Sequence, residues 1–182
     1  MKKLIVVLAV AACAVAAQAA TVAWTVTNIY KGNTTDKAQT TDGYMVYLIN
    51  DAMYSQSDAA AALAAGTLTA ATISGKATAS SGLTAAGKLS TDANVGDLAN
   101  GTYYFYNVIV GGDNAVVGST VKLEVTPVGD PQLGSFNAKT LTQSADNWKS
   151  VTGGGGGGIP EPTSALLLLM GGAMLALRRK QK

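Results

Sequence analysis

The first part of residues 20–152 alternates between hydrophobic and polar positions with the two-residue period of a half-buried β-strand. In residues 21–30, one face presents Val22, Trp24, Val26 and Tyr30, whereas threonines occupy the other. Residues 44–49 are continuously apolar instead. That pattern predicts a central strand covered on both faces, because neither side leaves room for polar groups.

The strongest strand pattern occupies residues 102–110, where four aromatic residues precede Val-Ile-Val. The turn sequence Gly-Gly-Asp-Asn follows, and residues 116–125 then alternate apolar and charged positions until Pro127. Strand, turn and strand together predict a β-hairpin.

Helical and unassigned segments lie between these strands. Asp58 is suited to cap a helix over residues 58–65, and Gly66 is suited to end it. Residues 67–73 favour another strand. Residues 74–101 are rich in Ala, Ser, Thr and Gly and favour no single element. Four apolar residues within them are candidates to anchor this segment to the core: Leu83, Leu89, Val95 and Leu98.

The last part of this region, around residues 133–148, supplies Phe136, Leu141 and Trp148 as packing residues. We therefore expect residues 20–152 to form one mainly β domain, an antiparallel β-sandwich or barrel with one short helix.

Composition narrows the possible functions of this domain. The chain has 182 residues with a net charge of +2, no His and a single Cys, Cys13. The weak basic excess argues against a nucleic-acid partner. The absence of His excludes His-based catalytic triads and most zinc sites. Residues 20–159 contain seven lysines and ten acidic residues, a net charge of −3, so the positive charge belongs to the two ends.

The N-terminal end has the features of a secretory signal peptide. Lys2 and Lys3 precede an apolar stretch, and Ala17-Gln18-Ala19 matches a small-x-small cleavage site. We expect a signal helix over residues 1–19, with signal peptidase cutting after Ala19. Two alternatives stay open: an uncleaved membrane anchor, and a lipidated N-terminus at Cys13, since the preceding Val-Ala-Ala loosely resembles a lipobox.

The C-terminal end is a second, separate module. Residues 153–158 are six consecutive glycines, so we expect residues 153–159 to act as a flexible linker. Pro160-Glu161-Pro162 follows, in which the prolines favour extended backbone. The apolar segment 163–177 would be about 22 Å long as a helix, short for a bilayer core of about 30 Å. A basic cluster, which snorkelling would place at the cytoplasmic surface, ends the chain: Arg178, Arg179, Lys180 and Lys182.

The Pro-Glu-Pro motif, the short apolar segment and the basic cluster, in this order over residues 160–182, resemble the PEP-CTERM sorting signal of exported bacterial proteins. The resemblance implies a single transmembrane helix and processing near the motif by an exosortase-type enzyme. It implies a protein held in the inner membrane before processing and located in the cell envelope or outside the cell afterwards. Such proteins often occur in bacteria that make exopolysaccharide. The alternative is a plain C-terminal membrane anchor with a proline-rich stalk.

The domain itself offers few candidates for chemistry. Asp113, Asn114 and Asp130 could offer oxygen ligands to calcium, although such residues beside Gly or Pro are more often turn formers. Of the common motifs for a catalytic serine, Gly-x-Ser-x-Gly does not occur. Tyr104 and Tyr106 share one face of the aromatic strand and could stack on sugar rings if that face were open.

We therefore expect an exported, non-enzymatic structural protein that needs no cofactor. An exopolysaccharide-binding module is the second hypothesis, and a small envelope hydrolase is the third. Possible glycosylation at Asn33, in the sequon Asn-Thr-Thr, and within the Ser/Thr-rich residues 67–91 is a further hypothesis.

Overall fold

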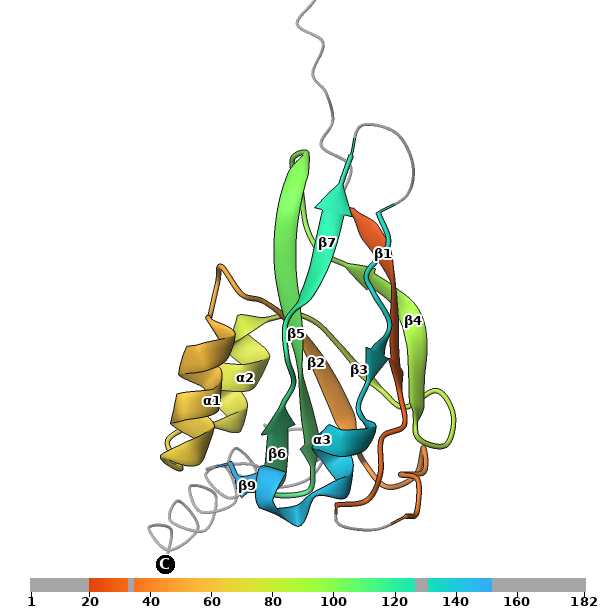
Figure 1. The fold of residues 1–182 in the computed structure, drawn as a ribbon, viewed down its shortest axis with the longest axis vertical. Coiled ribbons are helices and arrows are strands. Elements are labelled where there is room, and N and C mark those ends of the chain that lie inside the picture. Colours follow the sequence, from red (N-terminus) through yellow and green to blue (C-terminus); the bar gives the residue numbers. More distant parts are fainter. Residues whose placement is uncertain (1–19, 33–34, 127–130, 152–182) are drawn as a thin grey trace, which may run out of the picture.

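The structure, a computed structural model, describes residues 20–32, 35–126 and 131–151. These residues form two β-sheets and short helices (Figure 1). The strands are β1 Thr21–Thr27, β2 Met45–Asn50, β3 Ala77–Gly82, β4 Lys88–Asn94, β5 Gly101–Gly111, β6 Asn114–Val117, β7 Val121–Val125, β8 Phe136–Asn137 and β9 Lys149–Ser150. The helices are α1 Gln56–Ala64, α2 Ala70–Lys76, α3 Lys139–Gln143 and the 3-10 helix η1 Ala145–Asn147.

The larger sheet has six strands, and every pairing in it is antiparallel. Its order is β3-β2-β5-β6-β9, and β7 pairs with β5 on the same edge as β6. The smaller sheet has the order β4-β1-β8, in which β1 and β4 are antiparallel and β8 is parallel to β1. The prediction of a mainly β, mostly antiparallel domain is confirmed.

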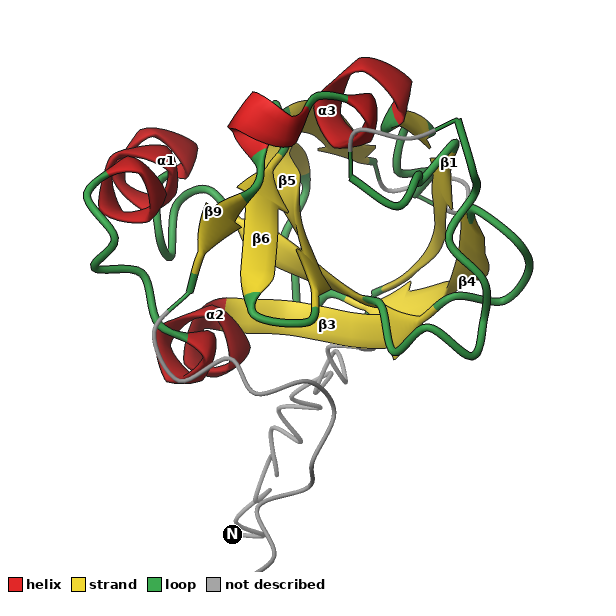
Figure 2. Cartoon of the chain, turned by 90° about the horizontal axis from the view of Figure 1, so that it is seen from below, coloured by secondary structure: helices red, strands yellow, loops and turns green. Residues whose placement is uncertain are grey.

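One hydrophobic core fills the space between the two sheets, and Figure 2 shows the strands arranged around it. From β1, Val22, Trp24 and Val26 point into this core and are at most 1% exposed. Phe105 and Ile109 of β5 enter it from the opposite sheet. The alternation seen in residues 21–27 therefore predicts the buried face of β1 correctly.

A second core lies on the other face of the six-stranded sheet, which both α1 and α2 cover (Figures 1 and 2). Ile49, Tyr106 and Val108 of the sheet meet Leu63 of α1 and Ile73 of α2. Strand β2 thus contributes to both cores and lies between β3 and β5, which confirms that it is a central strand covered on both faces.

The prediction of a single short helix is wrong, because residues 67–73, expected as a strand, contain most of helix α2. The Thr69 hydroxyl caps this helix by accepting a hydrogen bond from the Thr72 backbone N–H at 3.0 Å. Helix α1 begins earlier than expected, capped by Ser55, whose hydroxyl accepts from the Asp58 backbone N–H. Gly66 follows the end of α1 with φ +68°, the left-handed conformation expected of it.

Two further strands, β3 and β4, lie within residues 74–101, the segment whose sequence favoured no single element. Strand β3 belongs to the larger sheet and β4 to the smaller one, so the link between them joins the two sheets at one corner. The anchors predicted here are confirmed: Leu89 and Val95 are buried, and Leu83 and Leu98 pack against the first core. Phe136, Leu141 and Trp148 also pack against it, as predicted.

The predicted signal helix, glycine linker and transmembrane segment, in residues 1–19 and 153–182, lie outside the described residues. Within the part of the chain that the structure describes, no helix is long and apolar enough to cross a membrane.

Candidate functional site

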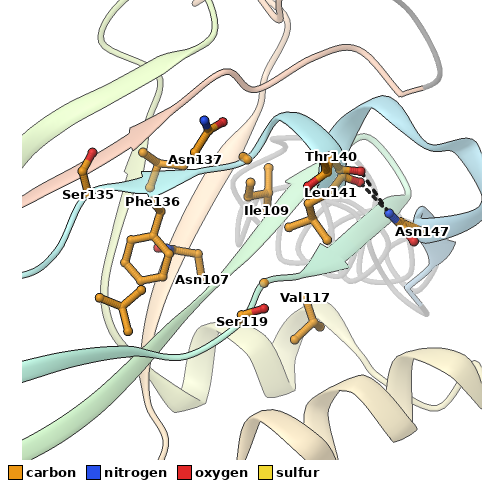
Figure 3. A pocket seen from close by; sticks show the side chains of 14 residues that line it. Asn107, Ile109, Val117, Ser119, Ser135, Phe136, Asn137, Thr140, Leu141 and Asn147 are labelled. Carbon is orange, nitrogen blue, oxygen red and sulfur yellow. Dashed lines mark hydrogen bonds between the residues drawn. The ribbon is translucent and has the colours of Figure 1, made fainter.

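The two sheets meet at the β3–β4 corner but leave a cleft along the opposite side. The volume of this cleft is about 440 Å³, within the range of small-molecule sites. It runs between the β6–β7 connection on the larger sheet and residues 135–141, which include β8 and the start of α3 (Figure 3). Beside the cleft the sheets come close together, since a Cβ added at Gly134 would lie 2.8 Å from Val121 Cγ1.

A β-bulge in the larger sheet shapes the floor of this cleft. Val117 pairs with Val108 and Val121 pairs with Phe105, so three residues of the return strand face only two of β5. The extra residue breaks the predicted strand 116–125 into β6 and β7. The Gly118 N–H donates to the Asn107 carbonyl at 2.8 Å, which keeps the bulge attached to β5. Bulges are frequent beside functional sites because they redirect neighbouring side chains.

Asn107 lies on the floor of the cleft and is 2% exposed. Its Oδ1 accepts a hydrogen bond from Trp24 Nε1 at 3.0 Å, which joins the two sheets across the first core. The indole N–H is only a donor, so the Asn107 oxygen must face Trp24 and the orientation of the amide is settled. Its Nδ2 is buried without a hydrogen-bond partner in the described residues. An unpaired buried donor costs about 1–3 kcal/mol.

The walls of the cleft combine apolar and hydroxyl-bearing side chains. Phe136 from β8 and Ile109 from β5 are among the apolar ones, whereas Ser119, Ser135 and Thr140 bring hydroxyl groups to its margin (Figure 3). None of the 14 lining residues is ionisable in the physiological pH range. The cleft is therefore uncharged, and it suits a neutral ligand better than an ionic one.

Two asparagines fix the outer wall in place. Asn137 Oδ1 accepts from Asn28 Nδ2 at 3.2 Å and from the Lys139 backbone N–H at 3.1 Å. Asn147 Nδ2 donates to the Leu141 carbonyl at 3.0 Å and to that of Thr140 at 3.4 Å. The wall that contains α3 is therefore held by side-chain hydrogen bonds at both of its ends.

The tyrosine pair predicted as a glycan contact does not form one open surface. Tyr104 is 50% exposed, but Tyr106 is fully buried beneath the helices, and its hydroxyl donates to the Tyr54 carbonyl at 3.0 Å. The two residues do share a face of β5, as expected, yet the second core covers only the part of that face at Tyr106. This burial raises the pKa of Tyr106 well above its ordinary value.

The surface around Tyr104 contains an ion pair. Tyr104 lies opposite Lys122 of β7 in the sheet register, and Lys122 is paired with Glu124. The hydrogen bond between the two side chains raises the pKa of Lys122 and lowers the pKa of Glu124. Both are exposed, so this pair contributes little to stability. Tyr104 thus has one charged pair as its neighbour and no second exposed aromatic ring from β5.

A second, shallower hollow contains an aromatic pair. Tyr44 and Trp148 meet edge to face, with ring centroids 5.9 Å apart. A Cβ added at Gly32 would lie 3.2 Å from Trp148 Nε1, and one at Gly111 would lie 2.5 Å from the Tyr44 ring. The Trp148 indole N–H already donates to the Thr142 carbonyl at 2.9 Å. Because the glycines pack on these rings, this pair is better explained by packing than by ligand stacking.

The residues considered for calcium lie partly in a tight turn. Asp113 and Asn114 belong to the β5–β6 hairpin, which confirms that predicted turn, and Gly112 there has φ +60°. The Asp113 carbonyl accepts from the Val151 N–H at 2.9 Å. Asp130 and the sequon residue Asn33 lie outside the described residues. In the described part of the chain, no three His, Cys, Asp or Glu side chains gather as a metal site would require.

The residues proposed for sorting and cleavage all lie outside the described residues: Ala17, Ala19, Pro160, Glu161, Pro162, Arg178, Arg179 and Lys180. Comparison of the chain with protein-family models, with curated proteins and with solved structures finds no match.

Sequence reasoning missed Asn107 as a site residue. One signal for it was present, because Asn107 is the only side chain in residues 103–110 that carries an amide, and alternation places it on the same face as Phe105 and Ile109. A polar residue on an apolar strand face requires a partner. Its partner Trp24 is 83 residues away, however, and no local pattern connects the two.

Proposed function

We propose that this chain is an exported protein of the cell envelope or extracellular matrix, sorted by an exosortase-type enzyme. The observation that supports this most directly is the order of three features at the C-terminus: Pro160-Glu161-Pro162, a short apolar segment and a basic cluster. A signal peptide with cleavage after Ala19 and temporary anchoring by the C-terminal segment complete the proposal.

The limits of the folded domain agree with this division of the chain. The Ala20 N–H donates to the Gly96 carbonyl at 2.9 Å, so the residue directly after the proposed cleavage position is hydrogen-bonded to the domain. At the other end, Val151 is 4% exposed and its N–H donates to the Asp113 carbonyl. Both proposed processing sites fall outside the described residues, so cutting there would leave the described domain intact.

For the domain itself we propose a structural, non-catalytic role and the architecture of a partly open β-barrel. Support for the barrel comes from the β3–β4 corner, which joins the sheets, and from the cleft that separates them opposite. Support for the role comes from the buried polar residues in the described segments, which are Asn107 and Thr142. Neither side chain titrates, so neither can act as a general acid or base.

The second hypothesis, binding of exopolysaccharide, rests on a different surface from the one expected. Tyr106 is buried and can offer nothing to a sugar ring, which leaves Tyr104 alone on that face. The observation that favours exopolysaccharide binding is the uncharged cleft around Asn107.

Replacing Glu161 with alanine tests the sorting proposal in cells that make the protein. We expect most of the chain to keep its C-terminal tail and to stay with the membrane fraction, as measured by intact mass and fractionation. Ser164→Ala, close to the motif but outside it, is the control and should leave processing unchanged. If Glu161→Ala gives the same product mass and location as the native chain, the motif has no sorting role.

A further inference from the structure

We propose that the cleft around Asn107 is a binding site for a pyranose unit of a neutral glycan. The first step of the argument is the unpaired amide group. Asn107 Nδ2 is buried, has no partner in the described residues, and cannot be exchanged with Oδ1 because Trp24 donates to that oxygen. A ligand that places an acceptor oxygen at this nitrogen would remove the cost of leaving the donor unpaired.

The lining of the cleft restricts what that ligand can be. An anion would find no cationic side chain among the lining residues, and a cation would find no carboxylate. A pure hydrocarbon would leave Asn107 Nδ2 unpaired. The ligand must therefore be neutral and offer oxygen acceptors together with apolar surface.

A sugar ring meets these conditions within one small unit. Its C–H faces suit the apolar side chains of Phe136, Ile109 and Leu141, and its hydroxyl groups both donate and accept hydrogen bonds. The hydroxyls of Ser119 and Ser135 at the margin have no side-chain hydrogen bond in the described part of the chain, so they are available to such a ligand.

The site is also held rigid before any ligand binds. The floor is part of β5, fixed by the bulge contact from Gly118 and by the bond from Trp24. The outer wall is fixed through Asn137 and Asn147. Rigid walls reduce the entropy lost on binding, which favours measurable affinity in a small cleft.

Calorimetric titration of the full-length chain in detergent tests the proposal. The probes are neutral oligosaccharides of glucose, galactose, mannose and N-acetylglucosamine, with a galacturonic acid oligosaccharide as the charged comparison. We expect at least one neutral probe to bind and the charged probe to bind at least tenfold more weakly. Titration of the same neutral probe should shift the NMR signals of the Asn107 side-chain amide.

Variants identify the surface involved. Ser119→Phe should fill the mouth of the cleft and weaken binding at least tenfold, whereas Thr120→Phe, at the next exposed position outside the lining, should not. Tyr104→Ala should have no effect. If Tyr104→Ala abolishes binding and Ser119→Phe does not, the exposed tyrosine is the site and the cleft proposal is overturned.

The proposal is also overturned if no neutral probe binds and the Asn107 amide signals do not move. This outcome is independent of the sorting proposal. Tail processing is measured by mass in cells, whereas sugar binding is measured on the purified chain, so either can fail alone.

Discussion

At the scale of single residues, the domain depends on polar groups that pair across large sequence distances. Trp24 and Asn107 connect the two sheets through the first core, and the Tyr106 hydroxyl connects β5 to the Tyr54 carbonyl before α1. Gly87 has a similar role in the backbone: its φ is +63°, and an added Cβ would lie 2.9 Å from the Ile29 carbonyl. Each of these residues has a geometric role that only its neighbours in the fold reveal.

The burial of Tyr106 makes stability depend on alkaline pH. Because burial raises its pKa in the folded state, the native chain holds a proton that the unfolded chain loses above the ordinary value of 10.0. The unfolded state then binds fewer protons, so the free energy of unfolding falls as pH rises above about 10.

We predict that Tyr106→Phe lowers the free energy of unfolding by about 1 kcal/mol at pH 8, through the lost hydrogen bond. From pH 10 upward it should reduce the alkaline loss of stability by up to about 1.4 kcal/mol per pH unit. Denaturant unfolding at pH 8 and 11 measures both effects. Tyr104→Phe, at an exposed position, is the control. An alkaline loss in Tyr106→Phe equal to that of the native chain would contradict the prediction.

At the scale of elements, side-chain capping and burial make α2 a helix although its sequence favours a strand. Residues 67–73 contain β-branched residues that suit a strand, yet Thr69 caps α2 and Ile73 is 1% exposed in the second core. A helix of seven residues is marginal in isolation, so tertiary packing provides most of its stability.

Thr69→Ala should therefore lower the free energy of unfolding by about 1 kcal/mol, because α2 loses its capping hydroxyl. Denaturant unfolding of the full-length chain measures the change. Thr69→Ser is the matched control, since serine keeps the hydroxyl and should remain close to the native stability. Equal stability of the alanine and serine variants would show that the cap contributes nothing to α2.

At the scale of the whole molecule, the two ends of the domain lie far apart. Figure 1 shows the start of β1 near one end of the long axis and β9 near the other. A tail attached after Val151 therefore continues from the end with β9 and α1. The opposite end is formed by the first residues of β5 and by β7.

N-terminal sequencing of the exported protein tests where the signal peptide is cleaved. We predict that the mature chain begins at Ala20, that Ala17→Asp stops cleavage, and that Gln18→Asp, at the unconstrained middle position, leaves it unchanged. A mature chain that begins with a lipidated Cys13 would support the lipobox instead. An intact Met1 would support the uncleaved anchor.

Much of the fold could be predicted because local alternation reports which side of a strand is buried. The inward residues of β1, the two covered faces of β2 and the β5–β6 hairpin all follow from patterns within a few neighbouring residues. The candidate cleft could not be predicted in this way. It arises where β8 and the bulge after β6 approach from segments that are distant in the sequence.

By itself the sequence determined the mainly β character of the described region and the buried faces of β1 and β2, because side-chain periodicity and composition are local properties. The tertiary structure alone decided that α2 is a helix, that Tyr106 is covered while Tyr104 is exposed, and that Asn107 faces a cleft with an unpaired amide. These outcomes depend on which segments pack together, and packing joins residues such as Trp24 and Asn107 that no local pattern links.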